Sequence, residues 1–166
     1  MSEQCLIAEY ESVAQMEIAL EVLNKSDFTL EQYSVVMNAD DPALRQLEGE
    51  STERESESPP TSGAVGTGTF VGGVAAAPLS AATLIGPFMI LGPLVGMAAG
   101  AAAGGVLSSI QRWGVTEDAG AEYEKRVEQG SVLVIFHDSD ESQVRKADRL
   151  LMTTRPRSLE TFELSE

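Results

Sequence analysis

The apolar positions near the two ends of the chain repeat one pattern, a strand followed by a helix. Residues 5–10 (CLIAEY) alternate as a strand does, and residues 131–138 (SVLVIFHD) are almost continuously apolar, as in a strand buried on both faces. Each is followed by apolar residues spaced three and four apart, which predicts an amphipathic helix. Two more strands are predicted over residues 30–38 (LEQYSVVMN) and 158–164 (SLETFEL).

The two ends match each other when the sequence is shifted by 128 residues. Predicted N-caps, capping-box glutamines and core positions coincide at this shift. The matching pairs are Ser12 and Asp140, Gln15 and Gln143, Ala19 and Ala147, and Leu23 and Leu151. The sequence therefore predicts an α+β fold built on a duplicated β-α-β unit. Two such units form a four-stranded antiparallel sheet with two helices on one face, the ferredoxin-like arrangement.

A further helix is predicted just before the third of these strands. Thr116 is a suitable N-cap, and Ala119, Tyr123 and Val127 form a narrow apolar stripe. Gly130 then marks the end of the helix. This helix leads from the middle of the chain back into the sheet.

The middle of the chain differs sharply from both ends. Residues 41–62 (DPALRQLEGESTERESESPPTS) are charged and polar, which predicts a disordered acidic linker. From Ser58 to Gln111 there is no charged residue, and Gly and Ala dominate. The predicted organisation is residues 1–40 as the first half of the sheet domain, 41–62 as the linker, 63–111 as a Gly/Ala-rich helical hairpin, and 112–166 as the second half.

Glycines recur every four residues in the uncharged segment, which places them on one face of a helix. The candidate helix-packing residues are Gly92, Gly96, Gly100 and Gly104, with Gly68 and Gly72 on a first helix. The segment has room for two membrane helices of roughly 20 residues, and small residues let such helices pack closely. Arg112 and Trp113 are the candidate anchors at the membrane interface. A lipid bilayer and self-association through these helices are the expected partners; the alternative is a pair of Gly/Ala helices packed in a soluble protein or an oligomer.

Composition narrows the classes of partner and chemistry. A net charge of −15 argues against nucleic acid, whose phosphates require clustered Lys and Arg. One cysteine excludes an intrachain disulfide, and one cysteine with one histidine makes no Cys/His metal site. The first residues lack the pattern of a signal peptide, so we expect them in the cytoplasm.

No catalytic group of residues is visible in the sequence. Cys5 is expected to be a small buried residue, and His137 a polar residue at the end of a strand. The glycine-rich stretch GAVGTGTFVGG lacks the Lys-Ser/Thr pair and the spacing of a nucleotide-binding loop. We therefore expect no cofactor, no metal and no enzymatic activity.

The order of these features resembles that of the YflT-like family of heat-induced or general stress proteins. The matching parts are YESVAQMEIAL, a second strand containing VV, GMAAGAAAGG, and GVTEDAGAEYEKRVEQGSVLVIFHD, of which residues 114–134 are the most specific. The resemblance implies a bacterial protein with a ferredoxin-like domain and a glycine-zipper insertion, often membrane-associated and of unknown activity.

Two functional hypotheses follow. The first is a non-enzymatic, membrane-associated stress-response protein in the inner membrane with both termini in the cytoplasm. The second is a soluble cytoplasmic sensor or interaction module that oligomerises and binds a ligand or partner through its sheet.

Overall fold

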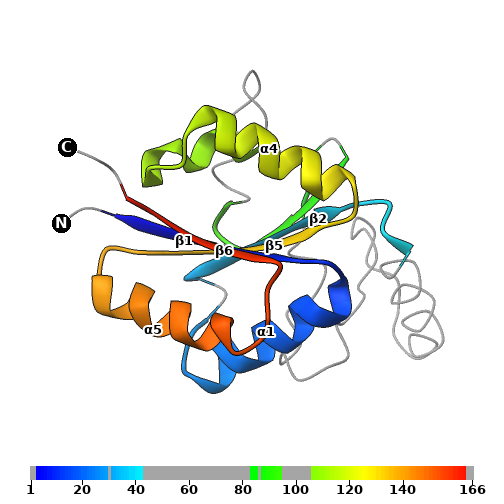
Figure 1. Ribbon diagram of the computed structural model, residues 1–166. Helices are drawn as coiled ribbons and strands as arrows, with labels where there is room; N and C mark the ends of the chain where they lie inside the picture. Colours follow the sequence, from blue (N-terminus) through cyan, green and yellow to red (C-terminus); the bar gives the residue numbers. More distant parts are fainter. Residues whose placement is uncertain (1–2, 30, 43–82, 86, 95–105, 164–166) are drawn as a thin grey trace, which may run out of the picture.

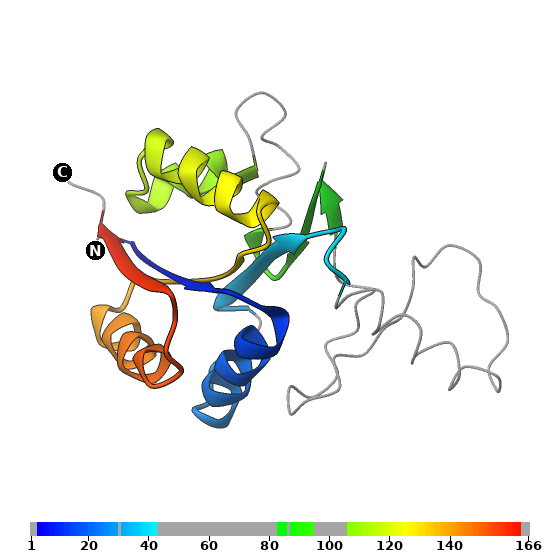
Figure 2. The ribbon, with the colours of Figure 1, turned by 45° about the vertical axis from the view of Figure 1, so that its right-hand side comes forward.

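A single antiparallel sheet lies between two layers of helices (Figure 1, Figure 2). The computed structural model describes residues 3–29, 31–42, 83–85, 87–94 and 106–163. The strands are β1 (Gln4–Tyr10), β2 (Tyr33–Asn38), β3 (Thr83–Ile85), β4 (Phe88–Leu91), β5 (Val132–Asp138) and β6 (Ser158–Glu163). The helices are α1 (Val13–Lys25), the 3-10 helix η2 (Val106–Trp113), α4 (Glu117–Glu128) and α5 (Glu141–Met152).

The strands follow the order β3-β4-β2-β5-β1-β6, and all neighbouring pairs are antiparallel. β1 and β5 pair over their whole length, from Gln4 opposite Asp138 to Tyr10 opposite Val132. The chain is therefore an α+β protein with an antiparallel sheet, as the sequence predicts.

Local capping groups start three helices where the sequence predicts them. Ser12 Oγ accepts a hydrogen bond from the Gln15 amide at 3.3 Å, and Thr116 Oγ1 accepts one from the Ala119 amide at 3.3 Å. Asp140 Oδ1 accepts the Ser142 amide at 2.8 Å. Each cap gives a partner to an amide that the first turn of a helix leaves unbonded, which confirms the three predicted N-caps.

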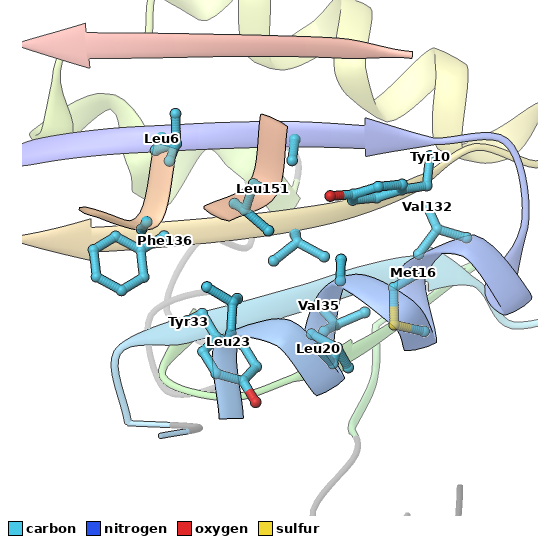
Figure 3. Packing of buried hydrophobic residues seen from close by; sticks show 14 of the residues in the cluster. Leu6, Tyr10, Met16, Leu20, Leu23, Tyr33, Val35, Val132, Phe136 and Leu151 are labelled. Atoms are coloured by element: carbon cyan, nitrogen blue, oxygen red, sulfur yellow. The ribbon is translucent and has the colours of Figure 1, made fainter. Parts of the chain in front are cut away.

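Side chains on the two faces of the sheet form two separate cores. Alternate residues of β1, Leu6, Ala8 and Tyr10, pack under α1 and α5 (Figure 3). The residues between them, Cys5 and Ile7, pack under α4 and η2. Since both faces of β5 are buried, its continuous apolar sequence is explained. The predicted pair of helices on one face is α1 and α5, and α4 covers the opposite face (Figure 1).

The prediction of a helical hairpin over residues 63–111 is wrong for residues 83–85 and 88–91. These residues form β3 and β4, which extend the sheet beyond β2 and give it six strands instead of four. The apolar run Phe88–Leu91 ends at Gly92 and Pro93, so it has the length of a strand and is too short for a helix. Residues 63–82 and 95–105 lie outside the described residues.

Two other predictions fall largely outside the described part of the chain. Of the predicted acidic linker, residues 41–62, the structure describes only Asp41 and Pro42. Among the helices in the described ranges, none has the length and apolar character needed to cross a membrane.

Candidate functional site

The predicted helix-packing glycines are represented in the described residues by Gly92. It lies directly after β4, not in a helix, and its φ is +89°. A Cβ atom at this position would lie 2.4 Å from the carbonyl oxygen of Tyr33 on β2. Gly92 therefore lets the chain pass close to β2, and its predicted role in a helix groove is wrong. The other predicted glycines, Gly68, Gly72, Gly96, Gly100 and Gly104, lie outside the described residues.

The predicted interface anchors lie at the end of η2. Arg112 is exposed, but Trp113 is only 3% exposed and belongs to the core beneath α4. Its ring stacks on His137, with centroids 4.2 Å apart and planes 14° from parallel. The prediction that Trp113 anchors the chain at a membrane interface is thus wrong, because this side chain is packed against β5.

One edge of the sheet is formed by β6. This strand pairs with β1 from Glu163 opposite Gln4 to Ser158 opposite Glu9, and in the described residues no strand lies on its other side. Figure 2 shows β6, in red, at the left edge of the sheet. Glu160, Thr161 and Glu163 are exposed. Strand edges of this kind carry unpaired N–H and C=O groups that can bind another strand.

Side chains of β6 are held by the strand's own domain. On the face under α4, Glu160 accepts a hydrogen bond from the Tyr123 hydroxyl, and Phe162 packs against the core. On the other face, Gln4 Nε2 donates to Glu163 Oε1 at 2.5 Å. The two carboxylates are therefore directed toward neighbouring elements, and Thr161 lies between them.

One end of β6 is fixed by a buried carboxylate on β1. Glu9 is 1% exposed and accepts hydrogen bonds from Ser131 Oγ at 2.8 Å, Ser158 Oγ at 3.0 Å and Arg126 Nη1 at 2.9 Å. Arg157 Nε lies 3.9 Å from the same carboxylate. The group joins β1, β6, α4 and Ser131, the residue before β5, at a single point.

The electrostatics of this cluster keep Glu9 ionised. Burial opposes the charge, but hydrogen bonds from Ser131, Ser158 and Arg126 outweigh burial and hold the pKa of Glu9 below its ordinary value. Three donors bind the carboxylate, one on Oε1 and two on Oε2, so it is tied into the domain. Its role is to hold the elements around β6 in place.

Helix α4 supplies the other half of the cluster. Arg126 reaches Glu9 from the last turn of α4 and also pairs with Glu122, one turn earlier. Its guanidinium lies 5.4 Å from the ring centroid of Tyr123, whose hydroxyl binds Glu160. Two side chains of α4 thus hold β6: Arg126 binds Glu9, which also accepts from Ser158, and Tyr123 binds Glu160.

Sequence reasoning missed Glu9, although the pattern holds a signal for it. Glu9 follows Cys5 and Ile7 on the same face of β1, where the alternation calls for an apolar side chain. A carboxylate in a buried strand position requires partners, since an unpaired buried charge is very costly. The partners come from residues more than a hundred positions away, so the sequence alone does not identify them.

The described residues contain little that suits a ligand. Within the described ranges no group of three or more His, Cys, Asp and Glu side chains is placed to hold a metal ion. A cavity between η2 and α4, lined partly by Leu107, Gly120 and Glu124, has a volume of about 70 Å³. Pockets for small molecules are larger, roughly 300–1,000 Å³.

Comparison with known proteins adds a family but no activity. No curated protein and no solved structure matches the chain. A model for proteins of unknown function, DUF1269, matches residues 60–156, which include α4, β5 and α5. Since this match covers more than half of the chain, the protein belongs to the DUF1269 family.

Proposed function

We propose that the protein is a non-enzymatic interaction module that binds an extended segment along the free edge of β6. The observation that carries this proposal is the edge itself, which has no neighbouring strand in the described residues. Its acidic side chains are engaged by Tyr123 and Gln4. Charged side chains are one means of protecting an edge strand; Glu160 and Glu163 are exposed, but each is bonded within the domain, which limits how far it projects over the edge.

The described polar groups support binding more than catalysis. Glu9 has donors on its carboxylate oxygens, and Cys5 is fully buried in an apolar environment that raises the pKa of its thiol. A nucleophilic cysteine requires the opposite, a lowered pKa and access to solvent. The small cavity beside α4 gives no room for a typical substrate.

A ferredoxin-like assignment completes the proposal for the fold. Its support is the order β2-β5-β1-β6 and the placement of α1 and α5 on one face (Figure 1). In this assignment β1-α1-β2 and β5-α5-β6 are the two copies of the β-α-β unit, and β3, β4 and α4 are additions. The addition of β3 and β4 covers one edge of the duplicated unit and leaves β6 as the other.

Site-specific cross-linking tests whether the edge of β6 binds a partner. A photoreactive amino acid at Thr161, on the edge, is expected to give adducts on illumination in cells. The same residue at Ile18, which is 54% exposed on α1, is the control and is expected to give none. Adducts should map to an extended segment in the partner because strand addition requires one. Equal labelling from both positions, or none from Thr161, contradicts the proposal.

A second candidate function is the membrane-associated stress protein that the resemblance to YflT-like proteins implies. The observation in its favour is the absence of charge from Ser58 to Gln111, a stretch in which the family match also begins. In this candidate the Gly-rich residues associate with the inner membrane or with each other, and the sheet domain lies in the cytoplasm. In the alternative, the whole protein is cytoplasmic.

Cell fractionation separates these two locations. If the uncharged residues outside the sheet and η2, 58–82 and 95–105, insert into lipid, the full chain is expected to stay in the membrane pellet after a carbonate wash, which removes peripheral proteins. A variant with Val95→Asp and Ala99→Asp is the control and is expected in the supernatant, because a charged residue inside an inserted segment costs up to about 2.5–3.5 kcal/mol. Recovery of the unmodified chain in the supernatant rejects membrane insertion.

A further inference from the structure

We infer that the strand bound at this edge is β6 of a second copy of the chain, paired antiparallel about a two-fold axis at Thr161. The inference rests on the proposed function, because it names the partner of the same edge. It joins the two sheets into one continuous sheet and leaves the helix layers of both copies on the outside.

The composition of β6 suits pairing with another strand. Its sequence, SLETFE, contains no proline, lysine or glycine, and its two exposed glutamates are bonded to Tyr123 and Gln4 of the same chain. Leu159 and Phe162 are only partly buried and contact the cores on opposite faces of the sheet. A neighbouring strand would cover the exposed parts of both side chains.

The faces of the strand restrict the registers that are available. Residues directly opposite each other in a strand pair point to the same face, so a two-fold axis between copies must pass through a residue. Within Ser158–Glu163, only an axis at Glu160 or at Thr161 keeps five residues of each copy paired. An axis at Leu159 or at Phe162 keeps only three residues of each copy paired.

Charge selects between these two registers. An axis at Glu160 places its carboxylate opposite the same carboxylate of the other copy, which is destabilising. An axis at Thr161 places the two threonines opposite each other, Glu160 opposite Phe162, and Leu159 opposite Glu163. No two like charges then face each other, and a threonine pair is a favourable cross-strand contact.

The net charge predicts how this dimer responds to salt. Each copy carries −15, so two copies repel each other at low ionic strength. Salt shortens the range of this repulsion from about 10 Å at 0.1 M to about 3 Å at 1 M. The backbone hydrogen bonds of the paired strands are much less affected, so we expect the dimer to become more stable as salt is added.

Cysteine cross-linking tests both the partner and the register. In the full chain at 1 M salt, Thr161→Cys is expected to form a disulfide-linked dimer under mild oxidation, because directly opposite Cα atoms lie within disulfide range. Glu160→Cys is the matched control: its two copies would be two residues out of register, beyond that range. The covalent dimer from Thr161→Cys should exceed that from Glu160→Cys at least about tenfold. The unmodified chain is the control for Cys5, which is buried and is expected not to cross-link.

Light scattering of the unmodified chain gives a measurement that does not depend on a variant. We expect twice the 17.6 kDa of one chain at 1 M salt, and a return toward one chain for Thr161→Lys, which places two positive charges opposite each other. Ile18→Lys on α1 should leave the dimer intact. A monomer at 1 M salt, or preferential cross-linking of Glu160→Cys, overturns the inference. Photo-adducts from Thr161 to a different protein would still support the proposed edge function, so the two failures are distinguishable.

Discussion

Replacing Glu9 with glutamine is expected to lower the free energy of unfolding by about 3 kcal/mol at pH 7, the lower end for breaking a buried ion pair. Glutamine has nearly the same volume but presents an NH₂ group to donors. Ser131 donates to one carboxylate oxygen, and Ser158 and Arg126 donate to the other, so the NH₂ group that replaces either oxygen would face a donor. Urea unfolding followed by circular dichroism measures the loss.

The control for this experiment uses the same arginine. Glu122→Gln removes the other carboxylate that pairs with Arg126, but the Glu122 side chain is 63% exposed. An exposed pair one turn apart on a helix contributes only about 0.5 kcal/mol, so this variant should unfold almost like the unmodified protein. Similar losses from both variants would show that burial of Glu9 is not the cause.

The difference between the unmodified protein and Glu9→Gln should also depend on pH. Because the pKa of Glu9 is lower in the folded than in the unfolded protein, ionisation of Glu9 favours folding. Its stabilisation is fully present above the unfolded pKa, about 4.3, and is lost as the pH falls through the lower folded value. The difference in unfolding free energy between the two proteins should therefore be similar at pH 7 and pH 5 and smaller at pH 3. A constant difference at all three pH values contradicts the assignment.

The parts of the fold that follow from the sequence are those set by neighbouring residues. Ser12, Thr116 and Asp140 bind amides two or three positions along the chain, so short patterns are sufficient to place these helices. Strands β1, β2 and β5 are marked by their apolar residues in the same way. The match between the two ends at a shift of 128 residues also predicted the antiparallel sheet and the α+β class.

The parts that the sequence did not reveal depend on contacts between distant segments. The run Phe88–Leu91 is apolar enough for a helix in lipid or a strand in a sheet, and its pairing with β2 decides between them. Trp113 follows an uncharged segment, which is typical of a membrane interface, but a tertiary contact with His137 on β5 buries it. Glu9 is likewise explained only by Arg126 and Ser131, far along the chain.

Gly92→Ala is expected to lower the free energy of unfolding by about 3 kcal/mol or more, from two causes. A residue with a side chain at φ +89° is strained by roughly 1–3 kcal/mol. In addition, the new Cβ would lie 2.4 Å from the Tyr33 carbonyl oxygen and 2.9 Å from Ser34 Cα, both backbone atoms of β2. Relief of this contact requires β4 to move away from β2, so amide exchange in both strands should rise together with the loss measured in urea.

Gly130→Ala separates the two causes, because Gly130 also has a positive φ, +108°, but nothing lies within 4 Å of a Cβ built there. The loss of unfolding free energy in Gly130→Ala measures backbone strain alone, about 1–2 kcal/mol. The additional loss in Gly92→Ala measures the contact with β2. The same pair of variants tests the helix interpretation of the glycine repeat directly. If Gly92 belonged to a helix, alanine would stabilise that helix by about 1 kcal/mol. A helix at Gly92 thus predicts that Gly92→Ala raises the free energy of unfolding. The close approach of the chain after β4 to β2 predicts that the same substitution lowers it.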